Sequence, residues 1–455
     1  MTTLNRLGQR NYSTKLDENR TVIKQHDKWY HTNNESLTKL STEEIQRHYK
    51  DMNEDSADGS SSLGEGESNL VSKVKFHLNH TRERMLGVFL PKNYPVAVSD
   101  NYIDYCKWQA LQYIAGSFSG VLSMQALLYA AGITSQMADS GNGFALAVIG
   151  GALAWVIKDG LGQLGGILFA SKVNTNFDAD PKFWRMSGEY ALIASALLEV
   201  TTAISGPSWF IVQASIANIG KNVSCFAASA TRAAMNQSFA KSDNLADVTA
   251  KATSQALACS LIGTALGIVY SSVTALAQFS FVKVFPVFCI LSAIQLFSLY
   301  KAVSKVRLKV LNKQRFFIVC SQYITNGNIL TTAQVSGMEK YVFPFFEEFQ
   351  RIKINSKIED LISVLGKGWQ EELATNGYIL VRLDNNVHIV FAQQANTDQV
   401  FRAMYQATCI LCGKEVSGDK LEEQVTLFIS NISAKGWAVD HDFVEDNSHM
   451  RLAIE

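Results

Sequence analysis

Ionisable side chains that interrupt a long uncharged region are the residues of this chain best placed to do chemistry. Five stretches of the middle region contain no Asp, Glu, Lys or Arg: residues 108–138, 140–157, 200–220, 252–282 and 284–300. Lys158 and Asp159 directly follow the second of these stretches. A charge at the centre of a bilayer costs about 2.5–3.5 kcal/mol by insertion scales, so such residues are usually paired or line a polar path.

Five charged residues and two glycines make up the predicted ligand site. Lys158 and Arg232 suit an anionic group such as phosphate, whereas Asp159 and Asp247 suit a proton or an amine. Asp247 and Lys251 are four residues apart, which places them on one helix face. Glycines permit a broken helix with exposed backbone groups, as in transporter sites. The predicted ligand-binding residues are Lys158, Asp159, Gly160, Gly162, Arg232, Asp247 and Lys251.

The same charges also fit a structural network that joins helices, or residues at a membrane surface. Adjacent residues point about 100° apart on a helix. We therefore expect Lys158 and Asp159 to pair with other helices rather than with each other, and Glu199, Lys221 and Arg232 are the candidate partners.

Hydropathy and charge placement predict a mainly α protein: a multipass helical membrane bundle followed by a small α/β domain. About six spans are expected, near 109–133, 144–170, 187–204, 209–230, 253–271 and 280–300. Lys and Arg occur on every second connection, as the positive-inside rule expects. Three Gly-x-x-x-Gly pairs, at 116/120, 162/166 and 263/267, indicate close helix packing. A soluble protein with a large helical core is the alternative.

The two ends of the chain differ from this region. Residues 1–85 are polar and predicted to be largely disordered, with a linker at about 36–70 and a short helix or docking segment around Trp29 and Tyr30. The first sixteen residues hold three bases and no acid, which is typical of an organellar transit peptide. Residues 86–315 form the predicted helical core, and 316–455 the α/β domain. That domain is expected to contain a hairpin at 377–392, helices at 396–413 and 419–434, and a second strand pair at 437–444 and 450–454.

Several kinds of chemistry are absent from the middle region. Lys+Arg and Asp+Glu number 41 each, and this balance argues against a nucleic-acid partner. No histidine lies within 81–387, so we expect no catalytic residue, no metal site and no cofactor there. Cys409 and Cys412 form a Cys-x-x-Cys motif, which we interpret as buried helix cysteines in preference to a redox pair.

Four motifs carry a family resemblance. They are Phe89-Leu90-Pro91 with Tyr94-Pro95 and Trp108–Gln112; the glycine-rich run from Trp155 to Ala170; Ala230-Thr231-Arg232-Ala233-Ala234; and Asn244–Val248 with Lys251 and Ser254-Gln255. Together they resemble the Root UVB Sensitive family over about residues 88–340. The chain departs from the pattern at Gln109, where an acid is usual, and at Ala252-Thr253, where Asp-Gly is usual.

The resemblance implies an integral or membrane-associated protein. In plants it implies a link to early seedling growth, auxin transport and vitamin B6 homeostasis, and an association with plastids. No catalytic residue is established for the family, so none is carried over.

Three functions remain open from the sequence. The favoured one is a multipass membrane protein that binds or moves a small polar or phosphorylated solute, possibly related to vitamin B6, in an organellar or endomembrane location. The second is a membrane scaffold that recruits protein partners through its terminal domains. The third is a soluble helical protein. Membrane lipid and a family paralogue or second copy are the other expected partners, and an enzyme is the least favoured class.

Overall fold

The computed structural model describes strand backbone within residues 15–39 and the greater part of the chain from residue 87 onward. The gaps after residue 87 are 132–143, 174–175, 206–208, 242, 276–279, 367, 415, 440–450 and 453–455, and the side chains of 144–154, 176 and 274–275 are not described either. The chain divides into two units, residues 1–83 and 84–455.

The N-terminal unit contains a four-stranded antiparallel sheet. Its strands follow one another in the order β1-β2-β3-β4, and their bounds are Lys15–Asp17, Arg20–Gln25, Lys28–Asn33 and Ser36–Lys39. Trp29 and Tyr30 therefore lie in a strand, so the predicted short helix is wrong. The apolar residues of β2 and β3 come as the adjacent pairs Val22-Ile23 and Trp29-Tyr30, so the sequence lacks the alternation that indicates a strand. Residues 40–70 of the predicted linker lie outside the described residues.

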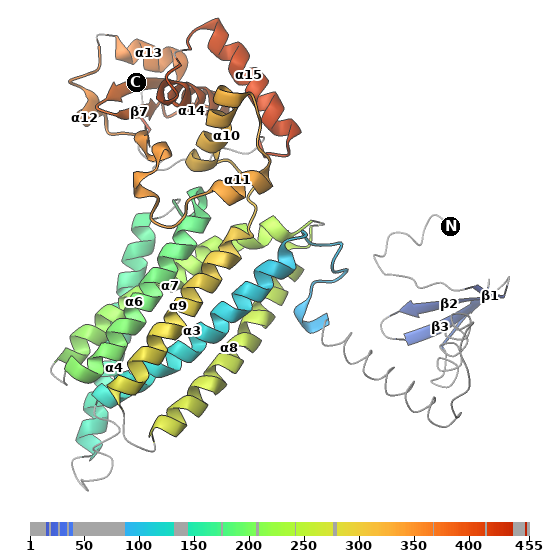
Figure 1. The fold of residues 1–455 in the computed structure, drawn as a ribbon, viewed down its shortest axis with the longest axis vertical. Coiled ribbons are helices and arrows are strands. Elements are labelled where there is room, and N and C mark those ends of the chain that lie inside the picture. The colour runs from blue at the N-terminus through green and yellow to red at the C-terminus, as the bar shows by residue number, and fades with distance from the viewer. Residues whose placement is uncertain are drawn as a thin grey trace. The chain divides into compact units, whose positions relative to one another are not determined.

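Six long helices form the main body of the second unit (Figure 1). They correspond to the six predicted spans and have the bounds α3 Tyr102–Ala130, α4 Phe144–Val173, α6 Pro181–Ser205, α7 Phe210–Phe239, α8 Leu245–Ala275 and α9 Phe281–Ser304, with the short α5 Asn176–Ala179 between α4 and α6. Helix α3 contacts α6, α8 and α9, and α7 contacts α4 and α6. Helices α3 and α6 are therefore central, and α4 and α8 lie at opposite sides of the body.

The three connections that carry the basic residues lie at one end of this body, which we call the junction end. Asn101, before α3, donates a hydrogen bond to the carbonyl of Lys305, after α9. The ring of Phe239, at the end of α7, lies 5.7 Å from that of Tyr102, at the start of α3. Phe169, near the end of α4, lies 6.1 Å from Trp184, near the start of α6. The predicted alternation of basic connections therefore places them on one side of the bundle.

Glycines allow two pairs of helices to approach closely. A Cβ atom at Gly263 of α8 would meet the backbone carbonyl of Ile114 of α3, and one at Gly267 would meet Val121. Gly162 and Gly166 of α4 meet α7 in the same way. The predicted packing role is confirmed for these two Gly-x-x-x-Gly pairs. In the third pair, Gly116 faces Gln295 of α9, whereas Gly120 faces open space.

The C-terminal part is built on a three-stranded mixed sheet in the order β5-β7-β6, with bounds Ile352–Ile354, Asn386–Phe391 and Tyr378–Leu383. Strands β6 and β7 form the predicted hairpin, and β5 pairs with β7 in parallel. Alternate residues of β7 face opposite sides. Ile389 and Phe391 pack with α14 (Thr397–Leu411) and α15 (Asp419–Ala434), while Val390 packs with Leu361 and Leu373 on the other face.

The remaining helices of this part are short and were not predicted individually. They are α10 Lys313–Asn326, α11 Thr332–Met338, α12 Ile358–Leu361 and α13 Trp369–Asn376, with the 3-10 turns η3 Pro344–Phe346 and η4 Glu348–Arg351. The two predicted helices at 396–413 and 419–434 are confirmed as α14 and α15. Most of the predicted second strand pair lies outside the described residues; of its described ends, Ala438 bridges to Val310 and Leu452 to Ala392. The predicted boundary at 315/316 falls inside α10.

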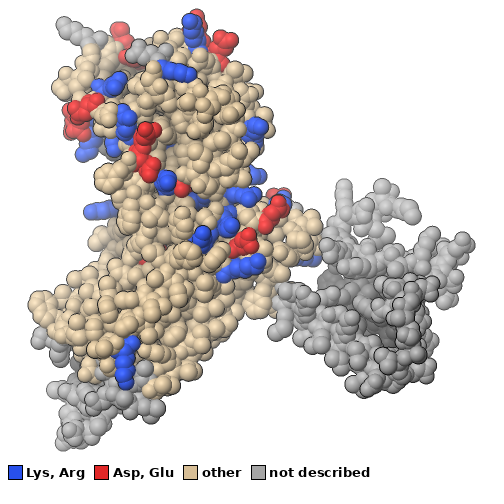
Figure 2. All heavy atoms as spheres, in the orientation of Figure 1, with Lys and Arg blue, Asp and Glu red and all other residues tan. Residues whose placement is uncertain are grey.

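Two of the described helices are long and apolar enough to cross a membrane, α8 over Leu245–Val273 and α9 over Phe281–Ser304. By this criterion, the expectation of about six membrane spans is met by two of the described helices. Helices α3, α6 and α7 carry buried Gln, Glu, Asn and Ser side chains, which lower their mean hydropathy. Figure 2 shows that the lower, helical part presents few charges on this face, whereas charged side chains gather on the C-terminal part and around the junction end.

Substituting glycine with alanine should separate packing from helix propensity. Gly263→Ala should lower the free energy of unfolding by about 1–3 kcal/mol, because its methyl group must push the α3 backbone away. Gly120→Ala should raise it by about 0.5–1 kcal/mol, because the same change meets open space and removes glycine flexibility. Chemical unfolding followed by circular dichroism measures both. Equal effects of the two variants would contradict the close approach of α3 and α8.

Candidate functional site

A buried carboxylate on α6 accepts hydrogen bonds from three helices. Glu189 Oε1 accepts from Gln112 Nε2 of α3 at 2.8 Å and from Gln295 Nε2 of α9 at 2.6 Å. Its other oxygen accepts from Arg185, one turn earlier on α6, at 3.1 Å. Gln109 in turn donates to Gln112 at 2.7 Å. We call Glu189, Gln112, Arg185 and Gln295 the hub. Every partner of the carboxylate is a donor, so these hydrogen bonds replace the hydration that Glu189 loses on burial.

A small cavity lies beside the hub, between α3, α6, α7 and α8. Its volume is about 30 Å³, room for roughly two water molecules. Three residues of α3 at four-residue spacing line one side, and the polar lining residues are Tyr105, Gln109, Tyr113, Arg185, Arg232, Asn236 and Gln255. Arg185 is neutralised by Glu189, whereas Arg232 makes no hydrogen bond or ion pair with any residue that the structure describes. Among the residues that line the cavity, Arg232 therefore carries the uncompensated positive charge, and this residue is also exposed to solvent.

Lys158 and Asp159 form their own ion pair on α4. Lys158 Nζ lies 2.5 Å from Asp159 Oδ1 and 4.9 Å from the ring centroid of Trp155. Asn218 of α7 donates to Asp159 Oδ1 and to the Lys158 carbonyl, both at 3.2 Å. The expectation that the two charges avoid each other is wrong, because the long lysine side chain bends back along the helix. Only the contact with Asn218 reaches another helix.

The two predicted glycines differ in their surroundings. A Cβ atom at Gly162 would meet the side chains of Asn218 and Asn222, so this glycine allows α7 to approach α4. A Cβ atom at Gly160 would meet nothing within 4 Å, and this residue is exposed. Helix α4 runs unbroken through both positions. The broken helix that the glycine density suggested is therefore absent within Phe144–Val173.

Asp247 and Lys251 hold the segment that precedes α3. Asp247 Oδ2 accepts from the backbone N–H of Lys92 at 2.7 Å, and Lys251 donates to the Gly87 carbonyl at 2.7 Å. On the same face of α8, Asn244 donates to Ala97 at 3.1 Å, and Gln255 donates to Phe89 at 2.5 Å. We call residues 87–98 the strap. Residues 244, 247, 251 and 255 are spaced along one helical face, and all four contact the strap backbone.

The predicted site residues thus fall into three groups. Lys158, Asp159 and Gly162 lie together at the seam between α4 and α7. Arg232 lies fourteen residues beyond Asn218 on α7, or about 21 Å along the helix axis at about 1.5 Å per residue. Asp247 and Lys251 lie on α8 and bind the strap. Only Arg232 lines the cavity.

The hub was not predicted from the sequence. Glu199 and Lys221, expected above to be partners of Lys158 and Asp159, instead form an ion pair with each other between α6 and α7. Glu189 and Arg185 lie in the same predicted span or at its edge, and their spacing of four residues was a usable signal. Gln112 and Gln295 carry no charge, so they lie unmarked inside uncharged runs. Among the described residues, no group of three His, Cys, Asp or Glu side chains is placed to hold a metal ion.

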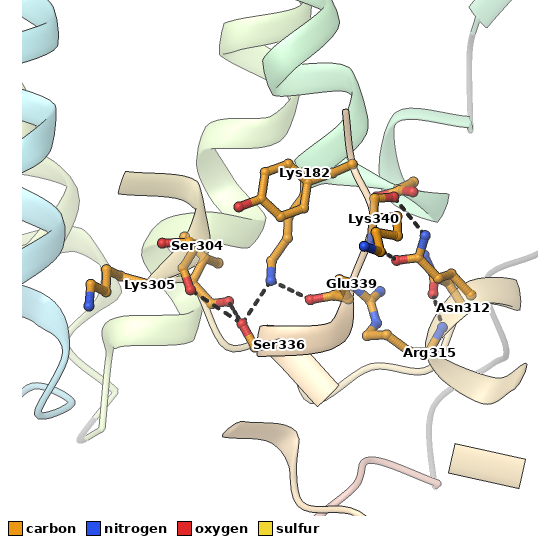
Figure 3. A network of polar contacts seen from close by, with 12 residues as sticks. Lys182, Ser304, Lys305, Asn312, Arg315, Ser336, Glu339 and Lys340 are labelled. Atoms are coloured by element: carbon orange, nitrogen blue, oxygen red, sulfur yellow. Dashed lines mark hydrogen bonds and ion pairs between the residues drawn. The ribbon is translucent and has the colours of Figure 1, made fainter. Parts of the chain in front are cut away.

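A second buried cluster joins the helical body to the C-terminal part (Figure 3). Lys182, at the start of α6, contacts Glu339 and donates to Ser336 Oγ at 3.0 Å, and Arg315 donates to the other Glu339 oxygen at 3.0 Å. Lys182, Arg315 and Glu339 are buried. With Asp180 they form what we call the junction cluster. Burial lowers the pKa of Lys182, and burial raises the pKa of Asp180 to about 6.

The Cys-x-x-Cys motif lies at the end of α14. Cys409 is buried, and Cys412 caps the helix without a disulfide. Burial raises the pKa of the Cys409 thiol to about 11. A thiol of this pKa is protonated at neutral pH and is a poor nucleophile. The burial and the raised pKa of Cys409 agree with its interpretation as a buried helix cysteine.

Fold and site together define a helical-bundle protein with a polar interior and an appended α/β part. Residues 75–327, more than half of the chain, match the family described as the vitamin B6 photo-protection and homoeostasis domain. The chain belongs to the Root UVB Sensitive family.

Among its relatives, protein root UVB sensitive 3 of Arabidopsis thaliana is 27% identical over 74% of this chain and 77% of its own length. RUS family member 1 of Dictyostelium discoideum is 29% identical over 66% of this chain and 54% of its own length. Protein root UVB sensitive 2, chloroplastic, of Arabidopsis thaliana is 24% identical over 79% of this chain and 82% of its own length. No solved structure matches the chain.

The junction cluster gives a pH-dependent prediction. The unfolded pKa of Asp is about 3.9, below the folded value, so Asp180 favours folding most below about pH 4. This contribution is lost as the pH rises through about 6. Asp180→Asn, which keeps an oxygen for the Phe183 N–H, should therefore be more stable than the native protein by about 1–3 kcal/mol at pH 7.5, with little difference near pH 4.

Urea unfolding of both proteins over this pH range measures the effect. Asp178→Asn is the matched control, because Asp178 is an exposed carboxylate two residues away. A stability difference between the native protein and Asp180→Asn that shrinks as the pH rises would contradict the burial of Asp180.

Proposed function

We propose that this chain is a multipass membrane protein that binds and transports a small polar solute with an anionic group. The observation that carries the membrane part is the inverted distribution of side chains in the helical body. Its interior holds the hub and the Glu199–Lys221 pair, both largely buried. Its surface holds large apolar residues, among them Leu257, Leu261 and Val269 of α8. In water such a surface is costly, whereas lipid favours it.

The polarity of the connections supports a membrane orientation. The basic connections gather at the junction end, where the α/β part also joins the body. The positive-inside rule places such an end in the cytosol, or in the matrix or stroma of an organelle. The helices that run from this end to the other are 24 to 31 residues long. About 20 residues are enough to cross a bilayer, so each helix is long enough to span it.

The solute proposal rests on the cavity and its charge. Arg232 supplies a guanidinium group without a partner among the described residues, and Tyr105, Tyr113 and Gln255 supply hydrogen-bonding groups around it. Arginine binds phosphate and carboxylate with two parallel hydrogen bonds. The cavity, at about 30 Å³, must widen to admit a vitamin-sized molecule. The domain name of the family makes a phosphorylated form of vitamin B6 the first solute to test.

Carbonate extraction tests the membrane proposal. The full-length protein, tagged at both ends, should remain in the membrane fraction, because apolar helices are not released by high pH. Protease protection of sealed vesicles should place both tags on one side, since six spans return the chain to its starting side. Release into the soluble fraction, or tags on opposite sides, would contradict the proposed topology.

Solute binding tests the site. Arg232→Gln should weaken the binding of pyridoxine phosphate to the reconstituted protein about tenfold or more, because a hydrogen bond to a charged group is worth about 1.5–3 kcal/mol. Asn236→Asp should weaken it similarly by adding a negative charge to the cavity wall. Isothermal titration measures both. Pyridoxine phosphate lacks the aldehyde that would react with lysines.

Lys241→Gln is the matched control for these two variants. Lys241 is an exposed base near the same end of α7 whose contact with Asp100, at 3.4 Å, lies on the surface. The control should bind like the native protein. Binding that is absent from the native protein, or that survives both Arg232→Gln and Asn236→Asp, would overturn the assignment of the cavity.

A further inference from the structure

An exposed aromatic loop follows the junction cluster. Residues 342–346 read Val-Phe-Pro-Phe-Phe, and the Phe343, Phe345 and Phe346 side chains are 63%, 60% and 99% exposed. Moving a Phe side chain out of water is worth about 1.5–3 kcal/mol. We call these five residues the aromatic loop. So large an apolar projection marks a binding surface.

The aromatic loop is held in place from both sides. The ring of Phe343 stacks on Tyr190 of α6 at 5.1 Å, and the ring of Phe345 lies 6.2 Å from Phe183, edge to face. Pro344 is buried and begins the turn η3. Phe343 has φ of 48°, a left-handed conformation that non-glycine residues rarely adopt. Such a conformation is retained where the surroundings fix it, so the loop is a built feature rather than a loose end.

The aromatic loop lies at the junction end of the helical body. Phe183 and Tyr190 lie in the first three turns of α6. Further rings gather there, since Trp184 lies 5.2 Å from Phe177 and 5.4 Å from Phe183. Rings collected at the end of an apolar bundle are typical of the boundary between hydrocarbon and water.

Charge identifies the surface that the loop meets. Between residues 301 and 341 the sequence holds seven bases and one acid. The buried Arg315–Glu339 pair removes one of each, and Lys313 is half-buried and donates to Gln350, which leaves five bases: Lys301, Lys305, Arg307, Lys309 and Lys340. Anionic headgroups attract such a segment by about 1 kcal/mol per base near the surface. The exposed Glu347 and Glu348 follow the loop and would remain in water, which limits its depth.

We propose that the aromatic loop inserts into the headgroup region of an anionic bilayer leaflet at the junction end. It thereby fixes the α/β part against the membrane surface. This inference rests on the proposed membrane function, and it adds a lipid contact outside the six helices. The rings of Phe345 and Phe346 enter the leaflet, while the bases face the headgroups.

Fluorine NMR tests the insertion. Full-length protein in nanodiscs of phosphatidylcholine and phosphatidylserine would carry one para-fluorophenylalanine, in place of Phe346, Leu261 or Leu427. Leu261 lies on the apolar face of α8, and Leu427 is an exposed apolar residue of α15 in the C-terminal part. All three side chains are exposed, so the substitutions should leave the fold intact. Doxyl-labelled lipid broadens a probe in the bilayer, and a soluble gadolinium chelate broadens a probe in water.

We expect the probe at 346 to lose its signal with doxyl lipid and to keep it with gadolinium, and the probe at 427 to do the reverse. If 346 behaves like 427 while 261 is broadened by lipid, the loop does not insert and the membrane proposal stands. If 261 responds to gadolinium alone, the membrane proposal fails. A probe at 346 that is shielded from both reagents indicates a protein contact and overturns the insertion.

Discussion

The carboxylate of Glu189 is the interaction on which the arrangement of the helical body depends. A charge buried in a low-dielectric interior is tolerated only when hydrogen bonds replace its hydration. The donors here come from α3, α6 and α9, so satisfying the charge requires all three helices to be in one register. A sliding movement of any one helix would leave a buried carboxylate short of a partner. The hub therefore fixes how the three helices pack against one another. Smooth apolar surfaces alone do not select one packing so strongly.

Two means of helix packing are combined around the hub. At the α3–α8 and α4–α7 seams, glycines remove side chains and let the backbones approach. Between α6 and its partners, polar side chains meet across the interface, as in the Glu199–Lys221 pair. Both means work without a hydrophobic driving force between helices, and both are found in membrane bundles for that reason. The C-terminal part uses the opposite strategy, with an apolar core on each face of its sheet.

The sequence predicted the long helices well, but it did not show which polar residues come together, for physical reasons. Long uncharged runs fixed the six helices, and the Asp384–Asn386 turn located the β6–β7 hairpin. Lys158 and Asp159 attracted attention because their neighbours are apolar, but a contrast along the chain does not show which helix faces which. The hub brings together two amides and one acid from three helices, and the Lys182–Glu339 contact joins residues 157 positions apart. Neutral glutamines in an uncharged run give no local signal of such contacts.

The peripheral place of α4 has a mechanical consequence. Among the described residues, the extensive contacts of this helix are with α7 alone, across the seam of Gly162, Gly165 and Gly166. Side chains of α7, among them Asn218, Ile219 and Phe226, lie directly over these glycines. A residue larger than glycine at any of the three positions would therefore displace α4 from its one extensive partner, and the ion pair of Lys158 and Asp159 would be displaced with it.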